Sequence, residues 1–122
     1  MTFITDENKE KLQKFTKFVK KELDLKIVPT IAILNGRGEL KTTASYDYTK
    51  ENKIIKVYAK DRMMVDIMRS IAHEMTHHKQ WEDGKLKVKP PDIGGPIEDE
   101  SNAIAGQLIK KYALIDDSIY DD

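Results

Sequence analysis

The sequence contains no cysteine and no long apolar run, and its 122 residues show no excess of charge of either sign. Without cysteine, neither disulfide bonds nor thiolate metal ligands are available. No apolar stretch approaches the roughly 20 residues that a membrane-spanning helix needs. Lys plus Arg equals Asp plus Glu at 21 each, and this balance argues against a dedicated nucleic-acid surface, which usually shows a basic excess.

The length predicts one domain over residues 1–122. A chain of this size buries roughly two thirds of its unfolded surface, which suffices for one modest core. Residues 1–20 form a lysine-rich polar pattern, which differs from the apolar segment of a signal peptide. We therefore expect a soluble, cytoplasmic protein.

The most informative stretch is His73-Glu74-Met75-Thr76-His77, an H-E-x-x-H pattern. On a helix, positions i and i+4 share one face, so both imidazoles can reach a single ion. Neutral imidazole suits zinc, and a catalytic zinc site has three protein ligands and a water. Glu74 lies about 100° round the helix from His73, within reach of such a water. The pattern predicts a zinc site in which Glu74 is the catalytic base.

Helix phase supports this prediction. Apolar residues between 61 and 81 recur with a 3.6-residue period; they are Met64, Ile67, Met68, Ile71 and Met75. Relative to Met64, His73 and His77 fall at about 180° and 220°, opposite the core stripe. His78 falls at about 320°, beside the apolar stripe, which favours a packed or hydrogen-bonded structural histidine and not a metal ligand.

A second helical pattern covers residues 97–112, after a loop rich in Gly and Pro at 84–96. Two glutamates near its start, Glu98 and Glu100, are candidates for a third ligand. They lie about 200° apart on a helix, so both cannot face one metal ion. They also fall at opposite edges of the apolar stripe, so periodicity does not choose between them.

These two segments together resemble the gluzincin metallopeptidases, in which HExxH is followed by a helix that carries a ligating glutamate. The matching residues are Glu98-x-x-x-Asn102, with Glu98 21 residues after His77. The short chain is most similar to the minigluzincins, small proteins related to the catalytic domains of membrane-bound metallopeptidases. The resemblance covers mainly residues 61–112. It implies one zinc ion held by His73, His77 and Glu98, with Asn102 as a neutral residue of the second coordination shell.

The remaining elements are predicted by their composition. We expect a helix over residues 6–24, strands over 26–34, 39–45 and 53–58, a turn, with a hairpin, at 35–38 and a polar loop at 46–52. Pro29 cannot donate to a β-ladder, which predicts an edge or bulge position for the first strand. The predicted fold class is α+β and zincin-like: an N-terminal helix, a small three-stranded sheet, the HExxH helix, the glutamate helix and an acidic tail.

The expected function is that of a zinc-dependent endopeptidase acting on a peptide or protein substrate. Its oxyanion donor is not identifiable, although Tyr46, Tyr48 and Tyr112 are candidates by their chemistry. Two alternatives remain open: a catalytically silent zinc protein, and a peptidase-like regulatory module that binds a partner. Only the peptidase requires Glu74, because that residue is not a ligand.

The tail over residues 116–122 carries four aspartates. The simplest interpretation is a frayed terminus. Because minigluzincins are made in latent form, a second hypothesis is that this tail occupies the cleft of its own or a neighbouring molecule. A tail carboxylate would then replace the catalytic water, and binding to a neighbour would make the protein self-associate.

Overall fold

The computed structural model describes residues 6–34, 44–47, 53–59, 62–85 and 96–120. Its helices are α1 (Asp6–Leu23), α2 (Met64–Glu82), α3 (Pro96–Ala113) and the 3₁₀ helix η1 (Asp117–Tyr120); its strands are β1 (Thr30–Leu34), β2 (Ala44–Asp47) and β3 (Ile54–Tyr58). The predicted α+β class with a three-stranded sheet is confirmed. In the part of the chain that is described, no helix has the length and apolarity required to cross a bilayer.

Helix α1 forms because its apolar residues share one stripe, and it ends where one residue adopts a left-handed backbone conformation. Leu12, Phe15 and Val19 are buried, while its lysines face outward. Asp24 adopts φ 53°, and the N–H of Leu25 bonds to the Lys20 carbonyl at 3.1 Å. This is the Schellman motif of a helix C-terminus, and it explains why the helix ends at Leu23, one residue before the predicted end.

The sheet has the order β1-β3-β2, with β1 parallel and β2 antiparallel to β3. The predicted hairpin between the first two strands is therefore wrong, because β3 lies between them; the turn at 35–38 is outside the described residues. Strand β1 begins at Thr30, directly after Pro29, and lies at an edge of the sheet as predicted. Strand β2 includes Tyr46, which was expected in a loop.

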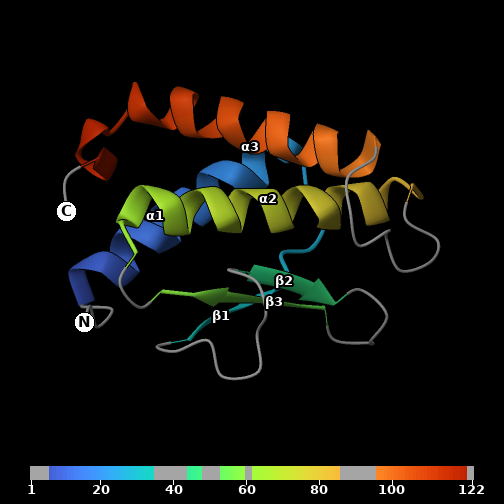
Figure 1. Cartoon of the computed structure of the whole chain (residues 1–122), viewed down its shortest axis with the longest axis horizontal. Helices are drawn as coiled ribbons and strands as arrows, with labels where there is room; N and C mark the ends of the chain where they lie inside the picture. Colours follow the sequence, from blue (N-terminus) through green and yellow to red (C-terminus); the bar gives the residue numbers. More distant parts are fainter. Residues whose placement is uncertain (1–5, 35–43, 48–52, 60–61, 86–95, 121–122) are drawn as a thin grey trace.

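Helix α2 occupies the middle of the molecule, between the sheet and α3 (Figure 1). Its Met64, Ile71 and Met75 are buried, as the helix phase predicted. This central position leaves only part of the helix surface accessible. His73 lies on that part, whereas His77 is buried beside it.

Polar contacts of Glu82 and His78 fix the carboxyl end of α2. The carboxylate of Glu82 accepts the backbone N–H groups of Lys26 and Ile27 at 3.0 and 3.1 Å. It also lies 3.1 Å from Nε2 of His78, whose Nδ1 is 2.6 Å from the Tyr46 hydroxyl. His78 is therefore the structural histidine that its helix phase predicted, and it joins α2 to strand β2.

Candidate metal centre

The HExxH pattern places two imidazoles side by side on α2. The ring centroids of His73 and His77 are 4.7 Å apart, and the rings are nearly perpendicular at 88°. The side chain of His77 is 6% exposed and that of His73 is 20% exposed. Both lie on the helix face opposite the core stripe, at the position that the 3.6-residue period predicted.

Helix α3 adds a carboxylate to this pair. Oε1 of Glu98 lies 2.8 Å from Nε2 of His77, and its Oε2 lies 3.2 Å from Nε2 of His73. One ligand atom from each of the three residues lies within 4.8 Å of the others. Tetrahedral zinc bonds of about 2.1 Å place neighbouring ligands roughly 3.4 Å apart, so small side-chain movements would fit this group to zinc.

Glu100, the other candidate for third ligand, points elsewhere. Its Oε1 accepts a hydrogen bond from Nε2 of Gln80 at 2.9 Å, and its Oε2 lies 3.5 Å from the ammonium of Lys85. The amide donor holds the pKa of Glu100 below its usual value. The structure therefore brings Glu98, and not Glu100, to the two histidines.

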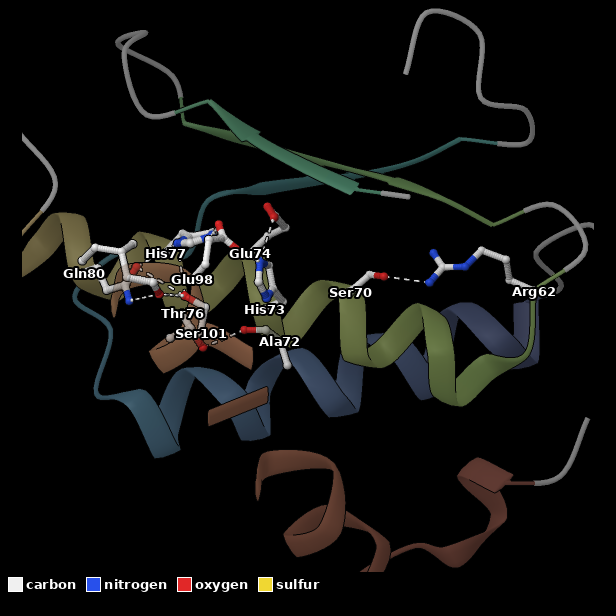
Figure 2. A network of polar contacts seen from close by, with 11 residues as sticks. Arg62, Ser70, Ala72, His73, Glu74, Thr76, His77, Gln80, Glu98 and Ser101 are labelled. Atoms are coloured by element: carbon white, nitrogen blue, oxygen red, sulfur yellow. Dashed lines mark hydrogen bonds and ion pairs between the residues drawn. The ribbon is translucent and has the colours of Figure 1, made fainter. Parts of the chain in front are cut away.

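Behind His77 lies a polar network that the sequence analysis missed (Figure 2). Nδ1 of His77 is 2.8 Å from Oε1 of Gln80 and 3.1 Å from Oγ of Ser101. The Gln80 amide donates to the carbonyl of Ile97 at 3.1 Å and to Glu100 at 2.9 Å, which fixes its oxygen toward His77. The signal was present in the sequence, because Gln80 stands one helical turn after His77.

This network determines which nitrogen of His77 carries a proton. Nδ1 faces the Gln80 oxygen, and the Ser101 hydroxyl beside it donates to the Ile97 carbonyl at 3.0 Å, so Nδ1 must be the N–H donor. Nε2 also faces an oxygen, that of Glu98. A neutral imidazole has only one N–H, so with Nδ1 as the donor Nε2 turns a lone pair toward the Glu98 oxygen, and a metal cation between the two atoms would suit both. Such a donor set fits a divalent ion.

Glu74 lies beside the three residues without joining them. Its Oε1 is 3.8 Å from Nε2 of His73, and its side chain is 8% exposed. Burial, with a further contribution from the charge of Glu98, raises its pKa to about 8. A carboxyl group titrating near neutral pH can both accept and donate a proton there.

His73 is positioned by Asn102, one helical turn beyond Glu98 on α3. Burial and the neighbouring charge of His77 lower the pKa of His73, against opposing hydrogen bonds from Asn102 and Glu98. A lowered pKa keeps this imidazole neutral, which is the state that binds metal. Asn102 therefore contacts His73, one of the two predicted histidine ligands.

A cavity of about 420 Å³ opens beside the site. Its lining includes His73, Glu74 and Ser70 of α2, Arg62 just before that helix, Asn102 of α3 and Ala44 of strand β2. Arg62 donates to the carbonyls of Tyr58 and Asp66 and to the hydroxyl of Ser70. These contacts hold this part of the cavity lining in place, and the one between Arg62 and Ser70 is drawn at the right of Figure 2.

The three tyrosines considered as oxyanion donors differ in where the structure places them. Tyr112 is buried in the core against Phe15 and Phe18, with ring centroids 5.1 and 5.0 Å away, so this candidate is wrong. The Tyr46 hydroxyl contacts His78. Tyr48 lies outside the described residues.

The described part of the tail lies far from the candidate metal site of its own molecule. Ile119 in η1 is completely buried and packs against α2 and α3, so the described tail is not a frayed terminus. Its helix η1 follows the carboxyl end of α3, roughly 20 Å along that helix from Glu98 (Figure 1). The tail as described does not enter the cleft of its own molecule.

Comparison of the chain with protein-family models, curated proteins and solved structures found no significant match. The function must therefore be inferred from the geometry of the site and from the residues that form it.

Proposed function

We propose that this protein is a zinc-dependent metallopeptidase with a zincin-like fold of the gluzincin type, which cleaves internal peptide bonds. The observation that carries the proposal is the convergence of three side chains from two helices. Ligand atoms of His73, His77 and Glu98 lie within 4.8 Å of one another. The Glu74 carboxyl lies beside them, and the cavity opens next to the group. A purely structural zinc site has no need for a buried, non-ligating carboxyl at this position.

His73, His77 and Glu98 would hold the ion. When bound, Zn²⁺ would supply a Lewis acid that activates water and polarises the substrate carbonyl. Glu74 would accept the proton of the attacking water and deliver it to the leaving amine, because its carboxyl lies beside His73 and has no ligand role. Gln80 and Asn102 would orient the two imidazoles.

The arrangement of elements supports the fold assignment. The sheet covers one side of α2, and the helix that follows α2 supplies the third ligand from the other side (Figure 1). This is the order that the resemblance to minigluzincins implies. Strand β2 is the edge strand next to the site, since Ala44 lines the cavity.

The test is Glu74→Gln, with the exposed glutamate substitution Glu7→Gln as its control. We expect Glu74→Gln to retain one zinc per chain, as measured by elemental analysis. Its turnover of quenched fluorescent peptides should fall on the order of 10²-fold or more. Zinc retained with activity unchanged in Glu74→Gln would overturn the assignment of Glu74. Zinc retained without activity in the wild type would favour a catalytically silent zinc protein or a regulatory binding module.

A further inference from the structure

A second cavity, of about 600 Å³, lies between α1 and strand β1. It is larger than the cavity beside the metal centre and lies at the opposite edge of the sheet. Its floor is apolar and includes Leu12 of α1, Ile31 and Ile33 of β1 and the buried Ile71 of α2. We call it the α1–β1 groove.

Lysines from α1 line this groove without acidic neighbours. Lys9, Lys17 and Lys20 all contribute to its wall, and no Asp or Glu does. Within the described ranges, none of the three has an ion-pair partner. By contrast Lys14, on another face of α1, pairs with Glu10 at 3.5 Å. The groove therefore presents uncompensated positive charge above an apolar floor.

The main chain of β1 offers hydrogen bonds at the same place. The Thr30 N–H bonds to the Lys53 carbonyl at 3.1 Å, and the Leu34 carbonyl accepts the Ala59 N–H at 2.9 Å, so these residues face β3. In a parallel ladder alternate residues face the same neighbour, so the N–H and C=O groups of Ile31 and Ile33 point away from β3. Among the described strands, β1 pairs only with β3.

Strand β1 lacks the usual protection of an edge. Its sequence, TIAIL, contains no charged residue, although exposed edges commonly carry lysine to prevent strand addition. The lysines stand instead on α1, beneath the position that a fourth strand would occupy. An added strand would thus gain both main-chain hydrogen bonds and charge pairing.

We propose that the α1–β1 groove is a docking site for an extended acidic segment of a partner protein, which adds as a fourth strand beside β1. The segment carries an apolar side chain between two acidic ones on its inward face. The apolar side chain enters the groove, and the acidic ones meet the lysines. Addition of a strand to an exposed sheet edge is an established mode of peptide recognition.

The spacing of the charges favours a peptide over a lipid. Lys9 and Lys20 are roughly 16 Å apart along α1. Two inward carboxylates four residues apart on a strand span about 13 Å, which approaches this separation. A single fatty-acid carboxylate could pair with only one end of the row. The tail of a second copy is a poor occupant, because its Ile119 is already buried in its own chain.

The test uses the fluorescein-labelled peptide Thr-Glu-Thr-Val-Thr-Glu-Thr, which is added to the full-length protein in the presence of EDTA. Fluorescence anisotropy should show binding that weakens as salt rises. Lys9→Glu and Lys20→Glu should each weaken it about fivefold to tenfold. Lys14→Glu, outside the lining of the groove, should leave it unchanged. Amide hydrogen exchange should slow at Ile31 and Ile33 when the peptide is bound.

Three outcomes would overturn the proposal. The first is no binding of the peptide to the wild-type protein. The second is equal binding by the groove variants and Lys14→Glu, or by a control peptide with Lys in place of Glu. The third is lysine-dependent binding of phosphatidylglycerol vesicles or palmitate without binding of the peptide, which would assign the groove to lipid. None of these results bears on the zinc site, because the experiment does not use the metal.

Discussion

Nδ1 of His77 lies 2.8 Å from Oε1 of Gln80, and this contact links the candidate metal site to both helices that form it. The amide nitrogen of Gln80 reaches across to the Ile97 carbonyl and to Glu100 on α3. A single side chain thereby fixes the tautomer of one imidazole and the position of the helix that carries Glu98. Metal-bound histidines generally depend on such a partner for orientation.

Replacing Gln80 by Leu should weaken zinc binding by about 10- to 100-fold, because Nδ1 of His77 loses its acceptor. The affinity can be measured by competition with a chelating indicator. Gln107→Leu, an exposed position on α3, is the matched control and should bind zinc like the wild type. Equal affinities for the two variants would show that the orientation of His77 does not depend on Gln80.

Glu98→Ala should nearly abolish the zinc-induced rise in melting temperature, whereas Glu100→Ala should reduce it only partly. Zinc that binds only the native state at 100 times its Kd contributes about 2.7 kcal/mol. Glu98 approaches both imidazoles directly, while Glu100 acts through Gln80. Scanning calorimetry with and without zinc measures the difference. A larger effect of Glu100→Ala would contradict the assignment of the third ligand.

Zinc binding should also weaken as the pH falls, because the histidines must be neutral to bind the ion, and since burial lowers the pKa of His73 the loss should begin below the usual histidine value of about 6.5. The same calorimetric comparison at lower pH checks this.

The metal-free protein should lose stability as the pH rises from about 4.5 to above 8. Burial raises the pKa of Glu74 from 4.5 to about 8, so the folded state holds this proton more tightly than the unfolded chain does. The resulting stabilisation is fully present below pH 4.5, the pKa of Glu74 in the unfolded chain. It is lost as the pH rises through about 8, the pKa of Glu74 in the folded state. It amounts to as much as roughly 5 kcal/mol. Urea unfolding of the wild type and Glu74→Gln in EDTA checks this, since the variant should lack the decline.

Ile119→Ala should destabilise the protein by about 2–4 kcal/mol, because it empties a completely buried position between η1, α2 and α3. Leu114→Ala, at a position 89% exposed, is the control and should change stability by less than about 0.5 kcal/mol. Thermal unfolding measures both. Deleting residues 116–122 should likewise destabilise the fold. If that deletion instead releases peptidase activity at unchanged stability, the hypothesis of an inhibitory tail acting on a neighbouring molecule gains support.

Several features of the fold could be predicted because they depend on local periodicity. The apolar stripes of α1 and α2 identified both helices and their buried faces, including Phe15, Ile71 and Met75. Pro29 predicted an edge position for β1. Strand pairing was predicted less well, since the insertion of β3 between β1 and β2 depends on long-range contacts that no local pattern encodes.

In the candidate site, too, some features follow from local sequence and others from tertiary packing. The sequence by itself determined that His73 and His77 share a helix face, because a spacing of four residues nearly completes one helical turn. Its periodicity could not choose between Glu98 and Glu100, which lie at opposite edges of the stripe of α3, and Glu98 was predicted only from the resemblance. The packing of α3 on α2 supplies the physical reason, because it turns Glu98 to the histidines and Glu100 to Gln80. The tertiary structure alone also buried Glu74 and so raised its pKa, because desolvation depends on what surrounds a carboxyl group and not on its neighbours in sequence.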